Sequence, residues 1–433
     1  MGLKITVIGG GSSYTPELID GFIKRKDELD VSEIHLVDIA EGKEKLKIVS
    51  DLSRRMIAKA NMKTKIVSTL NLEEAIKGSD FVLTQFRVGG LKARAKDEMI
   101  PLKYDLIGQE TTGAGGFAKA LRTIPVIMDI CNCISRLAPD AWLINFTNPA
   151  GLITEAVQKY TNVKVIGLCN VPIGMVNNVA KLMEVKPKRI SIEFAGLNHL
   201  VWGKKVYLDG EDITEGVIDK LSEGGRLTME NIPDLKWESG FLKAMEMIPC
   251  PYHRYYYRQR EMLREEKESF NKNRTTRATQ VMDIEKILFK TYENPLLTSK
   301  PAELEKRGGA FYSDAAVSLV SAIYNDKEEI HTVNIKNHKT INGLPEDAVI
   351  ECNAVIDKNG ARPIKQTGLP ESVMGLTYAV KTYESLTIEA VVKKSYNLGL
   401  QALMAHPLVQ DSDTAELLLK DILGANERYV DLH

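Results

Sequence analysis

A cysteine and a histidine occupy places in this sequence from which side chains can bind a metal ion. Cys169 follows the apolar run VKVIGL (163–168), and His199 lies in the short apolar stretch GLNHL (196–200). Thiolate sulfur and imidazole nitrogen are common metal ligands. Each residue alone is more typical of a buried structural side chain, since free cysteine packs well in cores. Thirty residues separate the two, so their spacing does not by itself define a metal site.

Two other stretches carry groups suited to substrate binding. Residues 87–116 combine two glycine pairs with Arg94 and Glu110. We expect a long substrate-binding loop here, with a solvated connection as the alternative. PYHRYYY (251–257) holds four tyrosines, most of which we expect to pack at a domain interface. Arg277 follows this stretch, and its guanidinium either binds an anion in a bidentate manner or remains solvated.

The segment VIGGGSSYTPEL (7–18) is typical of the glycine-rich turn that leads from a strand into a helix in dinucleotide-binding domains. Such glycines let the backbone approach a pyrophosphate, and the first amides of the helix then face the phosphates. An acidic residue that ends the second strand can accept from the adenosine ribose, which favours NAD over NADP. Tyr14 replaces the third glycine of the pattern, and a tight turn that binds nothing is the alternative. The residues predicted to bind NAD are Gly9, Gly11, Ser12 and Asp38.

Strands and helices that alternate through the first part of the chain must position these groups. The alternation predicts an α/β fold, a Rossmann-like, doubly wound parallel sheet that forms an NAD-binding domain over residues 1–168. Ligands of such sheets bind at the carboxyl ends of the strands, where Asp38, Asn148 and Cys169 lie. The predicted strands are 4–10, 33–39, 64–69, 80–86, 141–150 and 163–170, and the first two predicted helices are about 15–26 and 41–61.

The pattern changes in residues 169–433, which predict a larger α+β domain for catalysis, substrate binding and oligomerisation. We expect two antiparallel strands within 190–210, and the charged stretch 263–277 is interpreted as a mobile loop. The other predicted elements are helices at 278–292 and 311–324, strands at 331–337 and 348–357, and further helices in the last sixty residues.

Composition excludes several classes of protein. The 433 residues carry 57 Lys and Arg against 58 Asp and Glu, a net charge of −1, so no global field attracts nucleic acid or an anionic membrane. No apolar run approaches the roughly 18 residues that a membrane span needs, and the N-terminus lacks the features of a signal peptide. Five scattered cysteines predict no disulfide framework. We therefore expect a cytoplasmic protein.

A series of ordered motifs makes the sequence similar to glycoside hydrolase family 4, whose members are glycosidases that depend on NAD and a divalent metal. The similarity spans residues 5 to about 280, and the C-terminal helices are also typical of the family. The motifs are GGGSSYTP, RVGG with the downstream GQET, NPA, CNVP, GLNH and PYHRYY, followed by TRA. The resemblance implies the two-domain arrangement of lactate and malate dehydrogenases, with NAD and Mn²⁺ or another divalent metal as cofactors.

The resemblance also implies roles for individual residues. Cys169 and His199 match the metal ligands of the family. Tyr252 matches its catalytic base, and Glu110 matches an acidic residue that tunes this tyrosine. The positions that match substrate-binding residues are Arg94, Asn148 and Arg277.

Asn170, directly after Cys169, indicates the substrate class. The motif CNVP is similar to the 6-phospho-β-glucosidase branch of the family. The phospho-α-glucosidase branch carries an aspartate here that donates a proton, and members acting on unphosphorylated sugars carry a histidine. Asparagine cannot donate a proton as an acid, so the resemblance implies that a water molecule replaces this catalytic group. The expected substrate is a 6-phospho-β-glucoside such as cellobiose 6-phosphate, which is hydrolysed to glucose 6-phosphate and an aglycone.

The mechanism implied by the resemblance is an oxidation-assisted elimination, not hydrolysis by two carboxylates. NAD⁺ takes hydride from C3 of the glucoside, the metal polarises the resulting ketone, and Tyr252 removes the proton at C2. The aglycone then leaves, water adds at C1, and hydride returns to C3. The alternatives are a family member of different anomer specificity and an NAD-dependent 2-hydroxy-acid dehydrogenase. We expect a homodimer or homotetramer, with no nucleic-acid or membrane partner.

Overall fold

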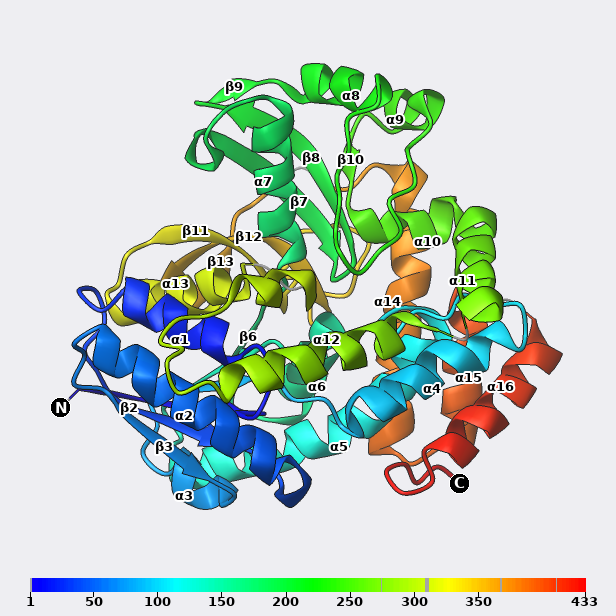
Figure 1. Cartoon of the computed structure of the whole chain (residues 1–433). Helices are drawn as coiled ribbons and strands as arrows, with labels where there is room; N and C mark the ends of the chain where they lie inside the picture. The colour runs from blue at the N-terminus through cyan, green and yellow to red at the C-terminus, as the bar shows by residue number, and fades with distance from the viewer. Residues whose placement is uncertain (1, 274, 308–310, 367, 410) are drawn as a thin grey trace.

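The described residues form one mixed sheet of thirteen strands that runs through the molecule (Figure 1). The computed structural model describes residues 2–433 apart from 274, 308–310, 367 and 410. The strand order is β10-β8-β7-β12-β11-β6-β5-β4-β1-β2-β3, with β9 paired to β8 and β13 paired to β12. Parallel strands occupy one end of this order and antiparallel strands the other.

The parallel end of the sheet has the strand order 3-2-1-4-5-6, which is that of dinucleotide-binding domains. The inner strands β1 and β4 are almost wholly buried, as expected where helices cover both faces of a parallel sheet, whereas the edge strand β3 is largely exposed or half-buried. The prediction of a Rossmann-like sheet is therefore confirmed. Its strands are β1 (Leu3–Ile8), β2 (Val31–Val37), β3 (Lys65–Thr69), β4 (Phe81–Thr84), β5 (Trp142–Asn145) and β6 (Lys164–Gly167). Its helices are α1 (Thr15–Lys24), α2 (Lys43–Lys59), α3 (Leu72–Ile76), α4 (Gly90–Leu102), α5 (Gly113–Leu137) and α6 (Ala150–Tyr160).

The second half of the chain extends this sheet with antiparallel strands. β11 joins the two parts, because Asn334 pairs with Gly167 of β6. Its strands are β7 (Ile190–Leu197), β8 (Leu200–Leu208), β9 (Glu211–Asp212), β10 (Ile248–Pro249), β11 (Glu329–Lys336), β12 (Val349–Asp357) and β13 (Gly360–Pro363). Its main helices are α7 (Val171–Leu182), α8 (Thr214–Ser222), α9 (Ser239–Met245), α10 (Arg254–Tyr257), α11 (Gln259–Asn273), α12 (Arg277–Tyr292), α13 (Tyr312–Tyr324), α14 (Glu371–Val392), α15 (Tyr396–Ala405) and α16 (Ser412–Ala425).

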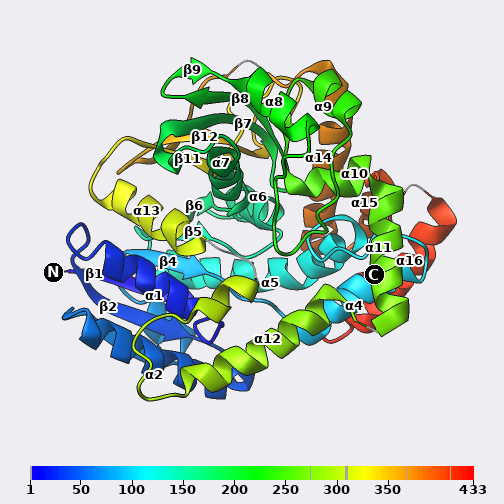
Figure 2. The same ribbon diagram turned by 45° about the horizontal axis from the view of Figure 1, so that its top comes forward.

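Helices from the second half also pack against the first half. α13 lies beside α1, and a Cβ atom at Gly21 would be only 2.9 Å from the Ser313 side chain (Figure 2). The two halves therefore share both a sheet and a helix layer, and the predicted boundary between residues 168 and 169 stays a prediction. Within the part of the chain that is described, no helix has the length and apolarity to cross a membrane.

The prediction of a long loop over residues 87–116 is wrong. α4 and the first turn of α5 take up most of this segment and leave only residues 103–112 as a connection. The glycines mark helix beginnings, since Gly89 has φ 75° before α4 and Gly113 has φ 64° at the first position of α5. Both values lie in the left-handed region that glycine adopts without a steric penalty.

The prediction of a mobile loop over residues 263–277 is also wrong for the residues up to 273. They form most of α11, which begins at Gln259 and whose charged side chains are largely exposed or half-buried. Met262 is fully buried on the other side of this helix. A high density of charge here indicates the solvated face of an amphipathic helix. Residue 274 lies outside the described residues, and α12 begins at Arg277.

Candidate active site

Five turns lie at the carboxyl ends of neighbouring parallel strands. Gly9 follows β1, Asp38 follows β2, Arg87 follows β4, Asn148 follows β5 and Cys169 follows β6. The strand order places β1, β4, β5 and β6 next to one another. This edge is where ligands bind in open α/β sheets, so the fold brings these five residues to one side of the sheet.

The glycine-rich turn has the geometry of a dinucleotide cradle. Gly9 has φ 82°, and a Cβ atom there would collide with the Phe86 backbone at 2.8 Å. The Gly11 amide donates to Asp38 Oδ2 at 2.8 Å, and a Cβ on Gly11 would lie 2.7 Å from that oxygen. The Ser12 hydroxyl accepts from the amide of Tyr14 at 3.2 Å. The residues of this turn therefore fit a pyrophosphate and an adenosine ribose, with α1 starting immediately behind them.

Cys169, His199 and Tyr252 converge although they are distant in sequence. His199 lies in the two-residue turn between β7 and β8 with φ 64°, a left-handed conformation that a non-glycine residue rarely adopts outside turns and functional sites. Its ring stacks on that of Tyr252, with centroids 3.8 Å apart and planes 5° from parallel. Asn198, the other residue of the turn, hydrogen bonds through its side chain to Cys169.

The donor atoms of Cys169 and His199 fit a divalent cation. The two side chains are only 3% and 4% exposed. His199 Nδ1 is buried and has no hydrogen-bond partner among the described residues. Burial, aided by Lys119, lowers the pKa of His199 to about 3, which keeps the imidazole in its neutral, ligating form. Burial and Glu351 raise the pKa of the Cys169 thiol, so a bound cation would be needed to hold a thiolate.

Cys169 and His199 are the two candidate ligands at this site among the residues that the structure describes. Among the described residues, no group of three or more His, Cys, Asp or Glu side chains is arranged to hold a metal ion. An open coordination shell is typical of catalytic metal sites, in which water or substrate oxygens complete the set.

Glu110 lies at the centre of a buried cationic cluster. Its carboxylate pairs with Arg87, with Arg94 at 3.1 Å and with Lys119 at 3.1 Å. Burial would favour the protonated acid, but the three cations hold the pKa of Glu110 well below its usual range. Burial and Arg87 in turn lower the pKa of Lys119 to about 7. The cluster therefore keeps positive charge at the site with an ionised carboxylate inside it.

Tyr252 lies beside this cluster. Its side chain is 5% exposed, and burial together with Cys169 raises the pKa of the phenol. Thr111, the residue after Glu110, hydrogen bonds to Tyr252 through its side chain, and the charge of Arg94 favours the phenolate. Tyr252 is therefore a neutral phenol in the protein alone, and an additional cation close to it would promote its ionisation.

Arg277, the first residue of α12, lies close to Arg94 of α4. Arg94 Nε donates to Glu98 Oε1 at 2.7 Å, and the other oxygen of Glu98 accepts from the Ala278 amide at 2.8 Å. Among the described residues, the acceptors that bind the Arg277 guanidinium are all uncharged. They are the side-chain oxygens of Asn231 and Gln280 and the backbone carbonyls of Lys306 and Arg307.

Asn148 and Asn170 flank the candidate metal ligands. Asn148 is half-buried, precedes the cis peptide bond to Pro149, and accepts from the Ala150 amide at 3.3 Å. Asn170 is 8% exposed and occupies the N-cap position of α7, directly after Cys169. Both amides therefore lie at the ends of neighbouring strands, β5 and β6, on the same edge of the sheet as the glycine-rich turn.

Sequence reasoning missed several residues that support the site. Lys119 and Glu351 are the clearest cases, at 2% and 0% exposure. Each is a charged residue inside an otherwise apolar segment, FAKAL (117–121) and AVIEC (348–352). A charge in such a segment must be paired when it is buried, so this pattern was the available signal.

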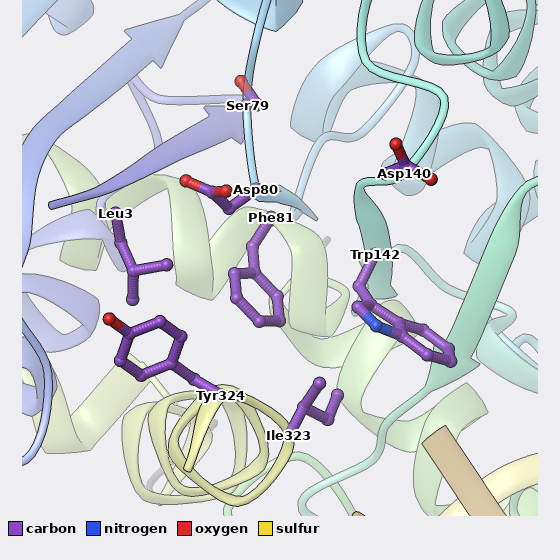
Figure 3. Close-up of a pocket in the computed structure, with 8 residues that line it drawn as sticks. All are labelled: Leu3, Ser79, Asp80, Phe81, Asp140, Trp142, Ile323 and Tyr324. Atoms are coloured by element: carbon purple, nitrogen blue, oxygen red, sulfur yellow. The ribbon is translucent and has the colours of Figure 1, made fainter. Parts of the chain in front are cut away.

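A separate cavity of about 270 Å³ lies at the opposite end of the parallel strands (Figure 3). Its lining comes from the beginnings of β1, β4 and β5 and from the end of α13. It therefore contains none of the predicted site residues. The lining residues are Leu3, Ser79, Asp80, Phe81, Asp140, Trp142, Ile323 and Tyr324.

The strand order and the glycine-rich turn define a protein of the Rossmann-like fold class. The structure of malate dehydrogenase from Cryptosporidium parvum matches the fold with a TM-score of 0.52 at 16% identity, covering 93% of this chain and 99% of that one. Within this class, the chain belongs to glycoside hydrolase family 4. The family 4 glycosyl hydrolase profile matches residues 4–185, and the profile of the family's C-terminal domain matches residues 194–409.

Similarity to individual members extends over the whole chain. A probable 6-phospho-beta-glucosidase from Bacillus subtilis is 52% identical, covering 99% of this chain and 97% of the relative. The 6-phospho-beta-glucosidase from Escherichia coli is 45% identical, covering 99% and 96%. The 6-phospho-beta-glucosidase from Thermotoga maritima, solved with NAD and glucose-6-phosphate, superposes with a TM-score of 0.92 at 39% identity over 100% of both chains. That enzyme was also solved with manganese, NAD⁺ and glucose-6-phosphate.

Proposed function

We propose that this chain hydrolyses 6-phospho-β-glucosides to glucose 6-phosphate and an aglycone, with NAD and a divalent cation such as Mn²⁺ as cofactors. The 6-phospho-beta-glucosidase from Escherichia coli is 45% identical to it, and the probable 6-phospho-beta-glucosidase from Bacillus subtilis is 52% identical, both over nearly their full lengths. Similar structures were solved with NAD, manganese and glucose-6-phosphate. Family membership disfavours the alternative of a 2-hydroxy-acid dehydrogenase.

The observation that carries the proposal is the convergence of three side chains beside a dinucleotide turn. Cys169 and His199 offer sulfur and nitrogen donors, and the Tyr252 ring is stacked on His199 at 3.8 Å. When bound, NAD supplies reversible hydride exchange with the sugar, and the divalent cation supplies Lewis-acid polarisation of a sugar carbonyl. Gly9, Gly11 and neighbouring residues would hold the first group, and Cys169 with His199 would hold the second.

Tyr252 is the residue we assign as the base that takes the proton from C2 of the sugar. A proton on the carbon next to a carbonyl group is acidic enough for a phenolate to remove. The ordinary pKa of tyrosine is about 10. Arg94 provides part of the positive charge that the phenolate needs. Glu110 moderates this charge, since it pairs with Arg94 and also lies close to Tyr252.

Arg94, Asn148 and Arg277 are assigned to substrate binding, and Asn170 is assigned to the catalytic position at which other family members carry a proton donor. Asn170 can hydrogen bond a sugar oxygen but cannot protonate the leaving group, so we assign that proton to a water molecule. Arg277 has uncharged partners, and its guanidinium can therefore bind the 6-phosphate without first breaking a strong ion pair.

We also propose a homodimer or homotetramer located in the cytoplasm. The free state of all five cysteines is compatible with a reducing compartment. Size-exclusion chromatography with light scattering measures the oligomer directly, and a monomeric mass would contradict this part of the proposal. Fractionation of cells into cytoplasmic and extracytoplasmic material tests the location.

The decisive experiment is a paired assay of p-nitrophenyl 6-phospho-β-glucoside and its α-anomer with added Mn²⁺ and NAD⁺. We expect nitrophenol release from the β-anomer and at least about tenfold slower release from the α-anomer, which corresponds to about 1.4 kcal/mol of discrimination. Preference for the α-anomer would keep the family chemistry but overturn the substrate assignment. Full activity after removal of both cofactors would overturn the mechanism.

A further inference from the structure

A polar pair is buried in the middle of the sheet, directly between the strands that carry the two candidate metal ligands. Asn334 on β11 and Glu351 on β12 are both 0% exposed and are direct cross-strand partners. Asn334 also pairs with Gly167 of β6, and Glu351 also pairs with Gly196 of β7. One register row therefore runs Gly167, Asn334, Glu351, Gly196 across four strands.

The two ends of this row lead into the candidate metal site. Cys169 comes two residues after Gly167, and His199 comes three residues after Gly196. The register of the sheet thus links the two turns that carry the ligands through the buried pair. A buried carboxylate is costly unless its surroundings hold it in place, which points to a specific task for Glu351.

Hydrogen bonds connect the buried pair to Cys169 through Asn198. Asn334 Nδ2 donates to Glu351 Oε1 at 2.9 Å, and Asn198 Nδ2 donates to the same oxygen at 3.3 Å. The side chain of Asn198 also lies close enough to Cys169 to favour its thiolate form, while its Oδ1 accepts from the Gly151 amide at 3.4 Å. An amide nitrogen has two hydrogens, so one serves Glu351 and the other is available to the sulfur.

We infer that Glu351 is a positioning residue for the metal centre: it orients the Asn198 amide so that this amide donates a hydrogen bond to the sulfur of Cys169. Asn334 fixes the carboxylate of Glu351 in the orientation that accepts from Asn198. The Gly151 amide fixes the other end of the Asn198 side chain. Partners of this kind hold a ligand's orientation and tune its affinity for the metal. The inference rests on the proposed function, since it takes Cys169 to be a metal ligand.

Glu351 acts from behind the ligand and does not coordinate the metal itself. Within the described residues, no third His, Cys, Asp or Glu joins Cys169 and His199 in an arrangement that could hold a metal. Both hydrogen bonds to Glu351 end on its Oε1, which faces the two asparagine amides. Its contribution to the site is therefore geometric, together with a negative charge that is only partial at neutral pH, because burial raises the pKa of Glu351 to about 7.

The test is a titration of chelator-treated protein with Mn²⁺, in which electron paramagnetic resonance measures the free ion. We expect Asn198→Ala and Glu351→Gln to weaken Mn²⁺ binding by about 10- to 100-fold. Co²⁺ is the second probe, because its thiolate-to-metal absorption band reports the sulfur directly. We expect this band to shift or weaken in both variants. If Asn198→Ala does not fold, Glu351→Gln, which keeps the side-chain shape, carries the test.

Asn353→Ala is the matched control. Asn353 lies two residues along the same strand, and its Oδ1 accepts from the Phe194 amide of β7 at 2.6 Å. We expect it to bind Mn²⁺ and Co²⁺ like the wild type even if its thermal stability falls. Wild-type affinity and an unchanged Co²⁺ band in both Asn198→Ala and Glu351→Gln would overturn the inference. Binding that survives Cys169→Ser would overturn the proposed metal site itself, which is a distinguishable result.

Discussion

The stacked rings of His199 and Tyr252 make one unit of a candidate ligand and a candidate base. Their centroids are 3.8 Å apart and their planes 5° from parallel, so a cation held by His199 would be a neighbour of Tyr252. A nearby positive charge favours the phenolate, whereas burial alone raises the phenol pKa. The stack therefore supports the proposal that this buried tyrosine serves as a base when the metal is bound.

Cys169→Ser should lower turnover of the phosphorylated β-glucoside by at least about 100-fold, since hydroxyl replaces the only sulfur ligand of the site. The thermal unfolding midpoint should change little, because the two side chains have almost the same shape. A Mn²⁺ titration alongside the kinetics separates lost metal binding from lost folding. Cys133→Ser, on the half-buried cysteine of α5, is the control. Wild-type turnover in Cys169→Ser would remove this residue from the site.

Tyr252→Phe should reduce kcat by about 10²- to 10⁴-fold, the usual contribution of a general base, with KM nearly unchanged. The variant should also lose incorporation of solvent deuterium at C2, which nuclear magnetic resonance of the product detects. Tyr257→Phe provides the comparison, because Tyr257 packs against Trp202 and Phe241 and not on His199. Deuterium incorporation at the wild-type rate in Tyr252→Phe would assign the base to another residue.

Arg277→Gln should raise KM for the phosphorylated substrate by about 10- to 100-fold, because a hydrogen bond to a charged group contributes about 1.5–3 kcal/mol. The preference for phosphorylated over unphosphorylated glucosides should narrow by the same factor. Arg264→Gln, on the exposed face of α11, controls for the loss of a positive charge. An unchanged preference in Arg277→Gln would place the phosphate elsewhere.

At the scale of elements, Glu285 of α12 connects this helix to the glycine-rich turn after β1. This carboxylate accepts from Ser13 at 2.9 Å and pairs with Lys45 of α2 at 3.1 Å and with Arg307 at 2.7 Å. The same helix begins at Arg277. One buried acid therefore couples the helix that carries a predicted phosphate ligand to the turn that is predicted to hold NAD.

Glu285→Gln should lower the free energy of unfolding by about 1–3 kcal/mol at pH 7, since one unit of pKa shift corresponds to about 1.4 kcal/mol. Burial would raise the pKa of Glu285, but Arg307 and Lys45 hold it at about 2. The folded pKa is below the unfolded value of about 4.3, so this stability is present above that value and is lost as pH falls towards 2.

Urea unfolding of the wild type and of Glu285→Gln at several pH values measures this difference. The difference between the two proteins should narrow below about pH 4, where the carboxyl binds a proton in the unfolded chain but not yet in the folded protein, and should close as pH approaches 2. Glu293→Gln, at the exposed C-terminal end of the same helix, should have the wild-type free energy of unfolding at all of these pH values. A gap for Glu285→Gln that does not depend on pH would contradict the ion-pair explanation.

At the scale of the whole molecule, one sheet connects the cofactor turn with the candidate metal site. Its parallel strands end at the cofactor turn and at Cys169, while its antiparallel strands carry His199. Because the sheet is continuous, the two sites are held at a constant separation by backbone hydrogen bonds. Hydride exchange and proton removal on neighbouring carbons of one sugar require such a fixed arrangement.

Removal of NAD or of the divalent cation should each abolish turnover, and adding the missing group back should restore it. The cofactor is oxidised again in each cycle, so the absorbance of NADH should show no net increase while nitrophenol accumulates. NADH formed in proportion to substrate would favour the dehydrogenase alternative. Turnover that persists in the presence of a chelator and without NAD would contradict the proposed chemistry.

The local features of this protein could be predicted from its sequence. Strand and helix periodicity predicted the parallel sheet, and the glycine-rich turn predicted the dinucleotide cradle, because a turn depends on the backbone freedom of neighbouring residues such as Gly9 and Gly11. The ordered motifs indicated the family and the residues of the site. The glycines of residues 87–116 were misinterpreted, since glycine at a helix start and glycine in a loop look alike without the fold.

Only the tertiary structure decided which distant residues meet. Asn198 reaches Cys169 and Glu351 because β6, β11, β12 and β7 are neighbours in the sheet, and this order arises from long-range pairing that local periodicity does not encode. The same holds for Ser13 and Glu285, whose hydrogen bond joins residues 272 positions apart in the sequence. The sequence by itself determined the chemical groups and the elements that carry them, whereas folding determined their partners, burial and electrostatic surroundings.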